Sequence, residues 1–125
     1  MKPVDYFLKF HTDFYHPINE GIKVSTIRDE SKPLNINDIC VAYFPLGKKA
    51  LLLRIDNHYA KRLKDLGEIE AQNEGYYHPD MLRHELVNIY PNLTDEDYVY
   101  IYEFTLVKGY RQTVLQFLKD HEGEL

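Results

Sequence analysis

The sequence predicts an α+β fold, in which about five to six mainly antiparallel strands form a small, partly open β-barrel with helices packed outside it. Short connections between the strand-like segments in the middle of the chain favour antiparallel pairing. Segments with helical spacing precede and follow these strands, where they can cover the sheet. A length of 125 residues without internal repeats fits one domain that covers 1–125.

The first half of the chain predicts one short helix among several strands. Segments rich in β-branched, aromatic or apolar residues predict four strands, over 5–10, 24–29, 39–44 and 50–57. Thr12 is a candidate N-cap for a helix over 13–20, and Gly21 then stands where a left-handed residue is expected. The segment 45–48 predicts a hairpin turn.

The second half of the chain changes to a helical period. Helices are expected over 62–73, from the N-cap Asp80 to the residue before Pro91, and over Arg111–Asp120. The segment 97–107 gives the strongest strand signal in the protein. Both of its alternating sets of positions are largely apolar or aromatic, as in a strand buried on two faces.

Composition indicates a cytoplasmic protein without a membrane span. The lone Cys40 cannot form an internal disulfide, and the longest apolar run, 39–46, is far short of the ~20 residues that span a bilayer. The polar N-terminal residues do not resemble a signal peptide. The formal charge of −5 argues against a protein that grips a long nucleic acid, although it leaves room for a local basic patch.

The segment 21–29 concentrates the residues that could carry chemistry. On a regular strand, Lys23 and Ser25 face one way while Thr26 and Arg28 face the other. Lys23 can therefore form a Ser-Lys pair with Ser25, which the periodicity slightly favours. Alternatively, Lys23 lies in the turn before the strand becomes regular and serves Thr26. An exposed strand that simply carries polar residues is the third interpretation.

A hydroxyl nucleophile needs a base, and lysine acts as a base only when it is neutral. Lowering the pKa of a lysine from ~10.4 to ~7–8 requires that its surroundings favour the neutral form over the charged form by roughly 4 kcal/mol. Burial and a nearby permanent cation such as Arg28 favour the neutral amine, whereas a carboxylate opposes it. The distance to such a carboxylate therefore decides whether the chemistry works.

These residues resemble a known signature. The run Gly-Ile-Lys-Val-Ser-Thr-Ile-Arg-Asp-Glu-Ser at 21–31, followed by Asn37-Asp38 and an apolar strand, is similar to the ASCH domain, a PUA-like β-barrel. The runs Ala-Gln-Asn-Glu-Gly at 71–75, Ile-Tyr-Pro at 89–91 and Tyr-Glu-Phe at 102–104 make it most similar to the N4-acetylcytidine amidohydrolases. The resemblance covers about 5–107 and leaves 108–125 as a C-terminal helical extension. Asn37-Asp38 replaces the usual Gly-Asp turn, and asparagine tolerates the left-handed backbone that this turn needs.

The resemblance implies specific roles. It implies a nucleophile at Thr26, a base at Lys23 and an acidic residue at Glu74, with Arg28 beside them to bind the substrate. Tyr43 and Tyr76 are candidates for stacking on a base, as tyrosine faces can do. The implied activity removes the acetyl group from N4-acetylcytidine or a related acylated cytosine nucleoside, without a cofactor.

Two alternatives remain open at this stage. One is an RNA-binding PUA-like module without catalysis, with a basic face near Lys48, Lys49, Lys61 and Arg62. The other is a domain that senses a modified base. No metal is expected, because the zinc-protease-like start at His84-Glu85 has Asn88 where the second ligand would stand.

Overall fold

A five-stranded, curled sheet forms the body of the protein in a computed structural model that describes residues 6–124. Its strands are β1 (Phe7–Lys9), β2 (Ser25–Arg28), β3 (Ile39–Phe44), β4 (Lys49–Arg62) and β5 (Tyr98–Val107). The spatial order is β1-β3-β4-β5-β2, in which β1 and β3 are parallel and all other neighbours are antiparallel. The predicted α+β class, with a mainly antiparallel, half-open PUA-like barrel, is confirmed.

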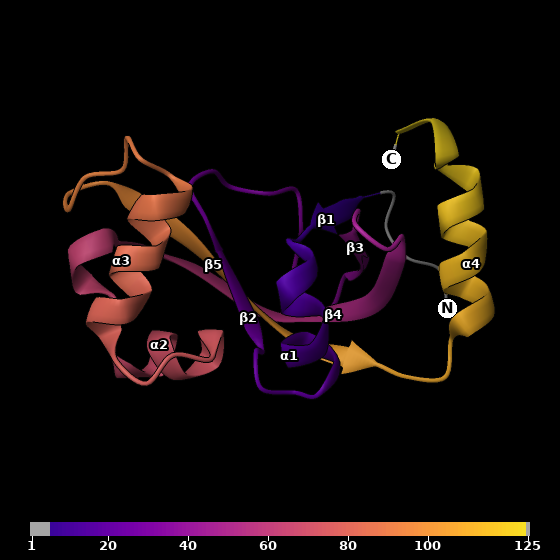
Figure 1. The fold of residues 1–125 in the computed structure, drawn as a ribbon, viewed down its shortest axis with the longest axis horizontal. Coiled ribbons are helices and arrows are strands. Elements are labelled where there is room, and N and C mark those ends of the chain that lie inside the picture. The colour runs from indigo at the N-terminus through magenta and orange to yellow at the C-terminus, as the bar shows by residue number, and fades with distance from the viewer. Residues whose placement is uncertain (1–5, 125) are drawn as a thin grey trace.

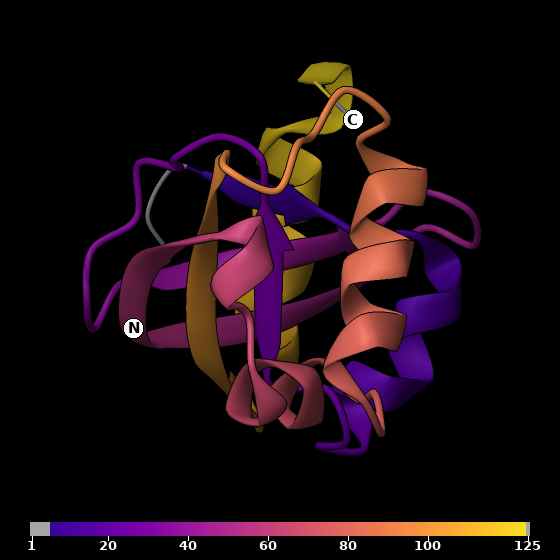
Figure 2. The ribbon, with the colours of Figure 1, turned by 90° about the vertical axis from the view of Figure 1, so that its left-hand side faces the viewer.

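Four α-helices lie around this sheet (Figure 1). They are α1 (Tyr15–Asn19), α2 (Glu68–Glu74), α3 (Pro79–Ile89) and α4 (Arg111–Asp120), and short 3-10 turns occupy Thr12–Phe14, Leu63–Asp65 and Glu122–Glu124. The helices α2 and α3 lie together at one end of the long β4 and β5 strands, and α4 lies at the other end. Figure 2 shows α1 and α3 on the same side of the strands.

Two expected element boundaries were wrong because long-range contacts outweigh local spacing. β4 runs to Arg62 instead of ending near Asn57, since it pairs with β5 from Leu52↔Val107 to Arg62↔Tyr98 across an irregularity between Ile55 and Asn57. The helix expected over 62–73 therefore begins only at Glu68.

The two predicted N-caps also differ. The Thr12 hydroxyl donates to the Leu46 carbonyl at 2.8 Å, and the His11 ring accepts from the amide of Asp13. The second helix begins at Pro79 with His78 as its cap, instead of being capped by Asp80. The left-handed conformations expected at Gly21 and Asn37 are present, with φ of 76° and 74°.

The core is divided into three clusters, and this division positions the site. One cluster packs Phe10, Phe44 and Leu53 between the strands and α1. A second joins Ile27 to apolar residues of α2, α3 and β5. The third lies under α4, where Phe117 packs on Val41 and Leu52. No helix within residues 6–124 is long and apolar enough to cross a membrane.

We expect Leu53→Ala to lower the free energy of unfolding by about 2–5 kcal/mol, because it opens a cavity in a central strand whose side chain is fully buried. Urea unfolding measures this loss. Leu46→Ala, at an exposed position in the β3–β4 turn, should change the same quantity by less than about 0.5 kcal/mol. Equal effects of the two variants would contradict the assigned core.

Burial raises the pKa of Cys40 to about 12, and the nearby Asp38 carboxylate adds to the rise. The thiol is fully buried, so we expect it to remain protonated and unreactive toward a disulfide reagent at about pH 8 while the protein is folded. Labelling should follow global unfolding in urea. Rapid labelling of the folded protein would show that β3 is more open than described.

Candidate active site

Lys23 lies in the connection between α1 and β2 with its amine held inside the protein. The left-handed Gly21 turns the chain after α1, and the amide of Lys23 donates to the Pro17 carbonyl at 3.0 Å. Lys23 is only 4% exposed, and its amine lies 4.9 Å from the centre of the Phe14 ring. Because β2 starts at Ser25, Lys23 is outside the regular strand and free of its alternation.

Glu74 is the carboxylate that meets this amine. It is the last residue of α2, and Gly75 ends the helix in a left-handed conformation with φ of 88°. Glu74 Oε1 accepts from Lys23 Nζ at 2.9 Å, and both side chains are about 5% exposed. The Asn73 carbonyl accepts from the amide of Val24 at 2.7 Å, which fixes the end of α2 beside the start of β2.

Thr26 and Arg28 form a second pair on β2. Arg28 Nε donates to Thr26 Oγ1 at 2.9 Å, and Arg28 Nη2 donates to the Lys9 carbonyl at 2.9 Å. The guanidinium also lies 4.8 Å from the centre of the Phe10 ring. A cationic donor on Thr26 Oγ1 stabilises negative charge on that oxygen, so the arrangement favours an alkoxide there.

The contact made by Ser25 is different from both sequence-based alternatives. Its hydroxyl donates to Glu74 Oε2 in a short hydrogen bond, so Ser25 and Lys23 share one carboxylate. Ser25 is fully buried and does not line the pocket described next. The position of Lys23 before the regular strand is the one that the Thr26 alternative requires.

Lys23, Thr26, Arg28 and Glu74 all line one pocket of about 290 Å³. Its wall is mainly aromatic and aliphatic, with contributions from Phe10, Phe14, Tyr76, Leu82, Leu86 and Tyr90. The pocket thus lies where the first and second core clusters meet, between the α1 region and α3. Its size is near the lower end for small-molecule sites, and it combines apolar walls with a few convergent polar groups.

Of the two tyrosines predicted to bind substrate, only Tyr76 lines this pocket. Tyr43 does not line it: this residue is 6% exposed, and its side chain lies on the face of β3 opposite to that of Phe44. Side chains alternate along a strand, so Tyr43 shares a face with Val41, which packs under α4. Phe44 occupies the opposite face and stacks on Phe10 at 5.6 Å.

Three further residues line the pocket without having been predicted as part of the site: Phe10, Phe14 and Glu85. These residues come from the segments around β1 and α1 and from α3, which are far apart in the sequence. Tyr90 belongs to the Ile-Tyr-Pro run of the family resemblance, and it lines the pocket together with Arg28. That run was therefore the one sequence signal available for this wall.

Burial and charge set the electrostatics of the pocket. Burial lowers the pKa of Arg28, and the surrounding acidic groups, including Tyr90 and Glu74, oppose this decrease. Burial raises the pKa of Tyr90, while the Arg28 charge acts in the opposite direction. Burial also raises the pKa of Tyr76, with contributions from Glu85 and Glu74. Both phenols are therefore neutral hydrogen-bond donors near neutral pH.

The described residues contain no cluster of three or more His, Cys, Asp or Glu side chains that could hold a metal ion. Glu74 already accepts from Lys23 and Ser25. The four predicted site residues offer this pocket an amine, a hydroxyl, a guanidinium and a carboxylate, and the side chains of His11, Tyr76, Glu85 and Tyr90 also line it.

Comparison with solved structures relates this arrangement to known folds. The chain superposes on an ASCH domain from Lactobacillus crispatus JV V101 with a TM-score of 0.66 at 14% identity, covering 80% of this chain and 79% of that one. It superposes on a mutant ASCH protein from Zymomonas mobilis with a TM-score of 0.63 at 8% identity, covering 95% of this chain and 81% of that one. The chain has the fold of the ASCH domain.

A protein from Enterococcus faecalis V583 shares this ASCH-like fold, with a TM-score of 0.60 at 14% identity over 74% of this chain. The chain spans 65% of that protein, slightly less than two thirds of its length. No protein-family model and no curated protein matches the sequence. The comparisons therefore establish a fold, and the site has to be interpreted from its own chemistry.

We expect Glu74→Gln to lower the free energy of unfolding by about 3–5 kcal/mol, because it leaves the Lys23 ammonium buried without a carboxylate. Urea unfolding of Glu74→Gln, Lys23→Met and the double variant forms a double-mutant cycle. The double variant should lose less than the sum of the single losses. Glu20→Gln, at an exposed position, is the matched control, and additivity in the cycle would contradict the buried pair.

Proposed function

We propose that the protein is an amidohydrolase that removes the acetyl group from N4-acetylcytidine or a related acylated cytosine nucleoside. The observation that carries this proposal is the meeting of Lys23, Thr26 and Glu74 in one small pocket, with Arg28 hydrogen-bonded to the Thr26 hydroxyl oxygen. These are the residue types that acyl transfer to a hydroxyl nucleophile requires. The aromatic and aliphatic walls suit a flat, neutral base.

The contact with the Glu74 carboxylate favours the charged form of Lys23, which opposes its use as a base, so the proposal requires a proton transfer between the two groups. A proton that moves across their 2.9 Å contact converts the ion pair into a neutral amine and a carboxylic acid. Filling the pocket with substrate excludes water, and a neutral pair loses less solvation than an ion pair. In this proposal the Glu74 carboxylate stabilises the Lys23 ammonium before the reaction and then accepts its proton.

The reaction then proceeds in two stages. Thr26 Oγ1 attacks the acetyl carbonyl carbon while Lys23 takes the hydroxyl proton, and Arg28 donates to the developing negative charge. The carbon–nitrogen bond breaks, the cytosine amine receives a proton from the Lys23–Glu74 pair, and an acetyl ester remains on Thr26. Water hydrolyses this ester, which releases acetate and restores the hydroxyl.

One step of this route depends on movement within the pocket. No hydrogen bond joins Lys23 and Thr26, both of which lie in the described part of the chain. Catalytic hydrogen bonds often tighten only when substrate is bound. The proposal therefore requires the Lys23 side chain to leave its contact with Glu74 and rotate toward Thr26, while its backbone stays bonded to Pro17.

The arrangement of basic residues favours the small substrate over a long RNA. Lys48 and Lys49 lie at the turn before β4 and at its first residue, whereas Lys61 and Arg62 lie at its opposite end. Lys61 pairs with Glu70 at 3.0 Å and Arg62 pairs with Glu96 at 3.0 Å. The four residues thus form no single uncompensated face.

We expect the purified protein to release cytidine and acetate from N4-acetylcytidine, measured by chromatography. Thr26→Ala should lower kcat/KM by roughly 10³-fold or more, because it removes the nucleophile. Thr26→Ser, which keeps a hydroxyl, should retain much more activity.

Ser25→Ala is the matched comparison, since it removes a neighbouring hydroxyl that only positions Glu74. It should lower kcat/KM by less than about tenfold. Loss of turnover in Ser25→Ala but not in Thr26→Ala would transfer the nucleophile to Ser25. An inactive wild-type protein would refute the hydrolase proposal.

A further inference from the structure

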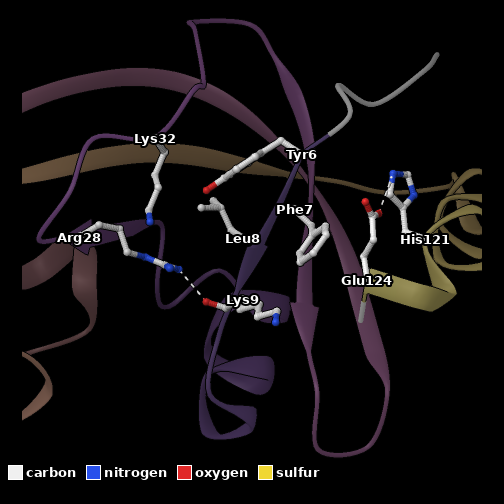
Figure 3. Close-up of a pocket in the computed structure, with 8 residues that line it drawn as sticks. All are labelled: Tyr6, Phe7, Leu8, Lys9, Arg28, Lys32, His121 and Glu124. Carbon is white, nitrogen blue, oxygen red and sulfur yellow. Dashed lines mark hydrogen bonds and ion pairs between the residues drawn. The ribbon is translucent and has the colours of Figure 1, made fainter.

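A second pocket of about 330 Å³ lies on the other side of Arg28 (Figure 3). It is formed by β1, the end of β2, the loop that follows β2, and the C-terminal turn, and it includes Tyr6, Lys9, Arg28 and Lys32. In Figure 3 the Lys32 amine and the Tyr6 hydroxyl point toward the Arg28 guanidinium, whereas His121 and Glu124 lie at the other end. Arg28 is therefore a wall shared by both pockets.

Arg28 has donors left over for a ligand. A guanidinium carries five N–H donors. Nε donates to Thr26 and one Nη2 donor is directed to the Lys9 carbonyl. Among residues 6–124, the remaining N–H groups of Arg28 form no hydrogen bond to a protein acceptor.

Two basic side chains of this pocket, Arg28 and Lys32, have no carboxylate partner among the described residues. Within residues 6–124, neither Arg28 nor Lys32 forms an ion pair. By contrast, the buried Lys23 and the partly exposed Lys61 each pair with a glutamate. Glu124 lies at the far end of the pocket beside His121. Two positive groups that point toward each other repel, and a bound anion relieves that repulsion.

Lys32 is held in place by the fold. Its backbone amide donates to the Tyr102 hydroxyl at 2.7 Å, and that hydroxyl donates to the Lys32 carbonyl at 3.2 Å. Tyr102 is 2% exposed, and Leu34, two residues further on from Lys32, is 3% exposed. The loop thus fixes the backbone of Lys32, so that only its side chain has to be ordered when a ligand binds.

We propose that Arg28, Lys32 and Tyr6 form a binding site for a phosphate-type oxyanion, and that Arg28 links this site to the Thr26 hydroxyl. The planar guanidinium fork suits two oxygens of a tetrahedral anion, the lysine adds a point charge, and the neutral phenol adds a donor. The anion is either free phosphate or the phosphate group of a nucleotide. The site goes beyond the hydrolase proposal and does not depend on it, because binding is measurable without turnover.

The first experiment titrates the full chain with inorganic phosphate at constant ionic strength and follows the backbone amides by NMR. We expect saturable shifts at residues 28–32. Lys32→Gln should weaken binding by roughly tenfold or more, the cost of one charge-assisted hydrogen bond. Lys108→Gln removes an equal charge at an exposed position outside the pocket and should change the affinity by less than about twofold. Absence of saturation, or equal weakening by the two variants, would overturn the proposal.

The second experiment identifies the source of the anion. Cytidine, cytidine 5′-monophosphate and cytidine 3′-monophosphate are compared with inorganic phosphate by calorimetry, in wild type and Lys32→Gln. A nucleotide that binds more tightly than both cytidine and phosphate, with an advantage that Lys32→Gln removes, identifies a nucleotide as the ligand. Equal affinities for nucleotide and phosphate identify free phosphate. Failure of both to bind would overturn the site, whereas a lack of amidohydrolase activity would leave these binding results intact.

Discussion

The buried contact between Lys23 and Glu74 is the interaction on which the site depends. It joins the connection after α1 to the last turn of α2, and Ser25 adds a second bond from β2 to the same carboxylate. Two charges that are about 5% exposed are costly to bury, so each is tolerated only while its partner is present. The proposed hydrolase uses the same pair, because a proton that moves between the two groups changes their charge without moving the backbone.

Arg28 is the second organising residue, and it acts in a different way. Its guanidinium stacks near Phe10, donates to Thr26, and holds the Lys9 carbonyl of β1. It thereby connects the ends of two strands that lie at opposite edges of the sheet. Because Arg28 lines both pockets, its positive charge contributes to the electrostatic potential in each of them.

The pocket itself exists because the core is divided. The cluster around Phe10 and Phe44 and the cluster around Leu82 and Leu86 are each packed, and the catalytic candidates occupy the seam between them. Residues at such a seam can be buried and still reach a ligand. This explains how Thr26 is only 4% exposed and yet lines a pocket.

The order of strands and helices and the left-handed turn at Gly21 were predictable from the chain alone, because local sterics and hydrophobic periodicity decide these features, and the turn at Asn37 was expected from the family resemblance. Whether Lys23 serves Thr26 or Ser25 was not predictable, since that depends on where β2 becomes regular. Tertiary contacts placed Lys23 before β2 and set Glu74 against the Lys23 amine. They also extended β4 to Arg62 and placed Tyr43 on the face of β3 that packs under α4. Each of these outcomes rests on contacts between residues far apart in the chain, which local spacing does not encode.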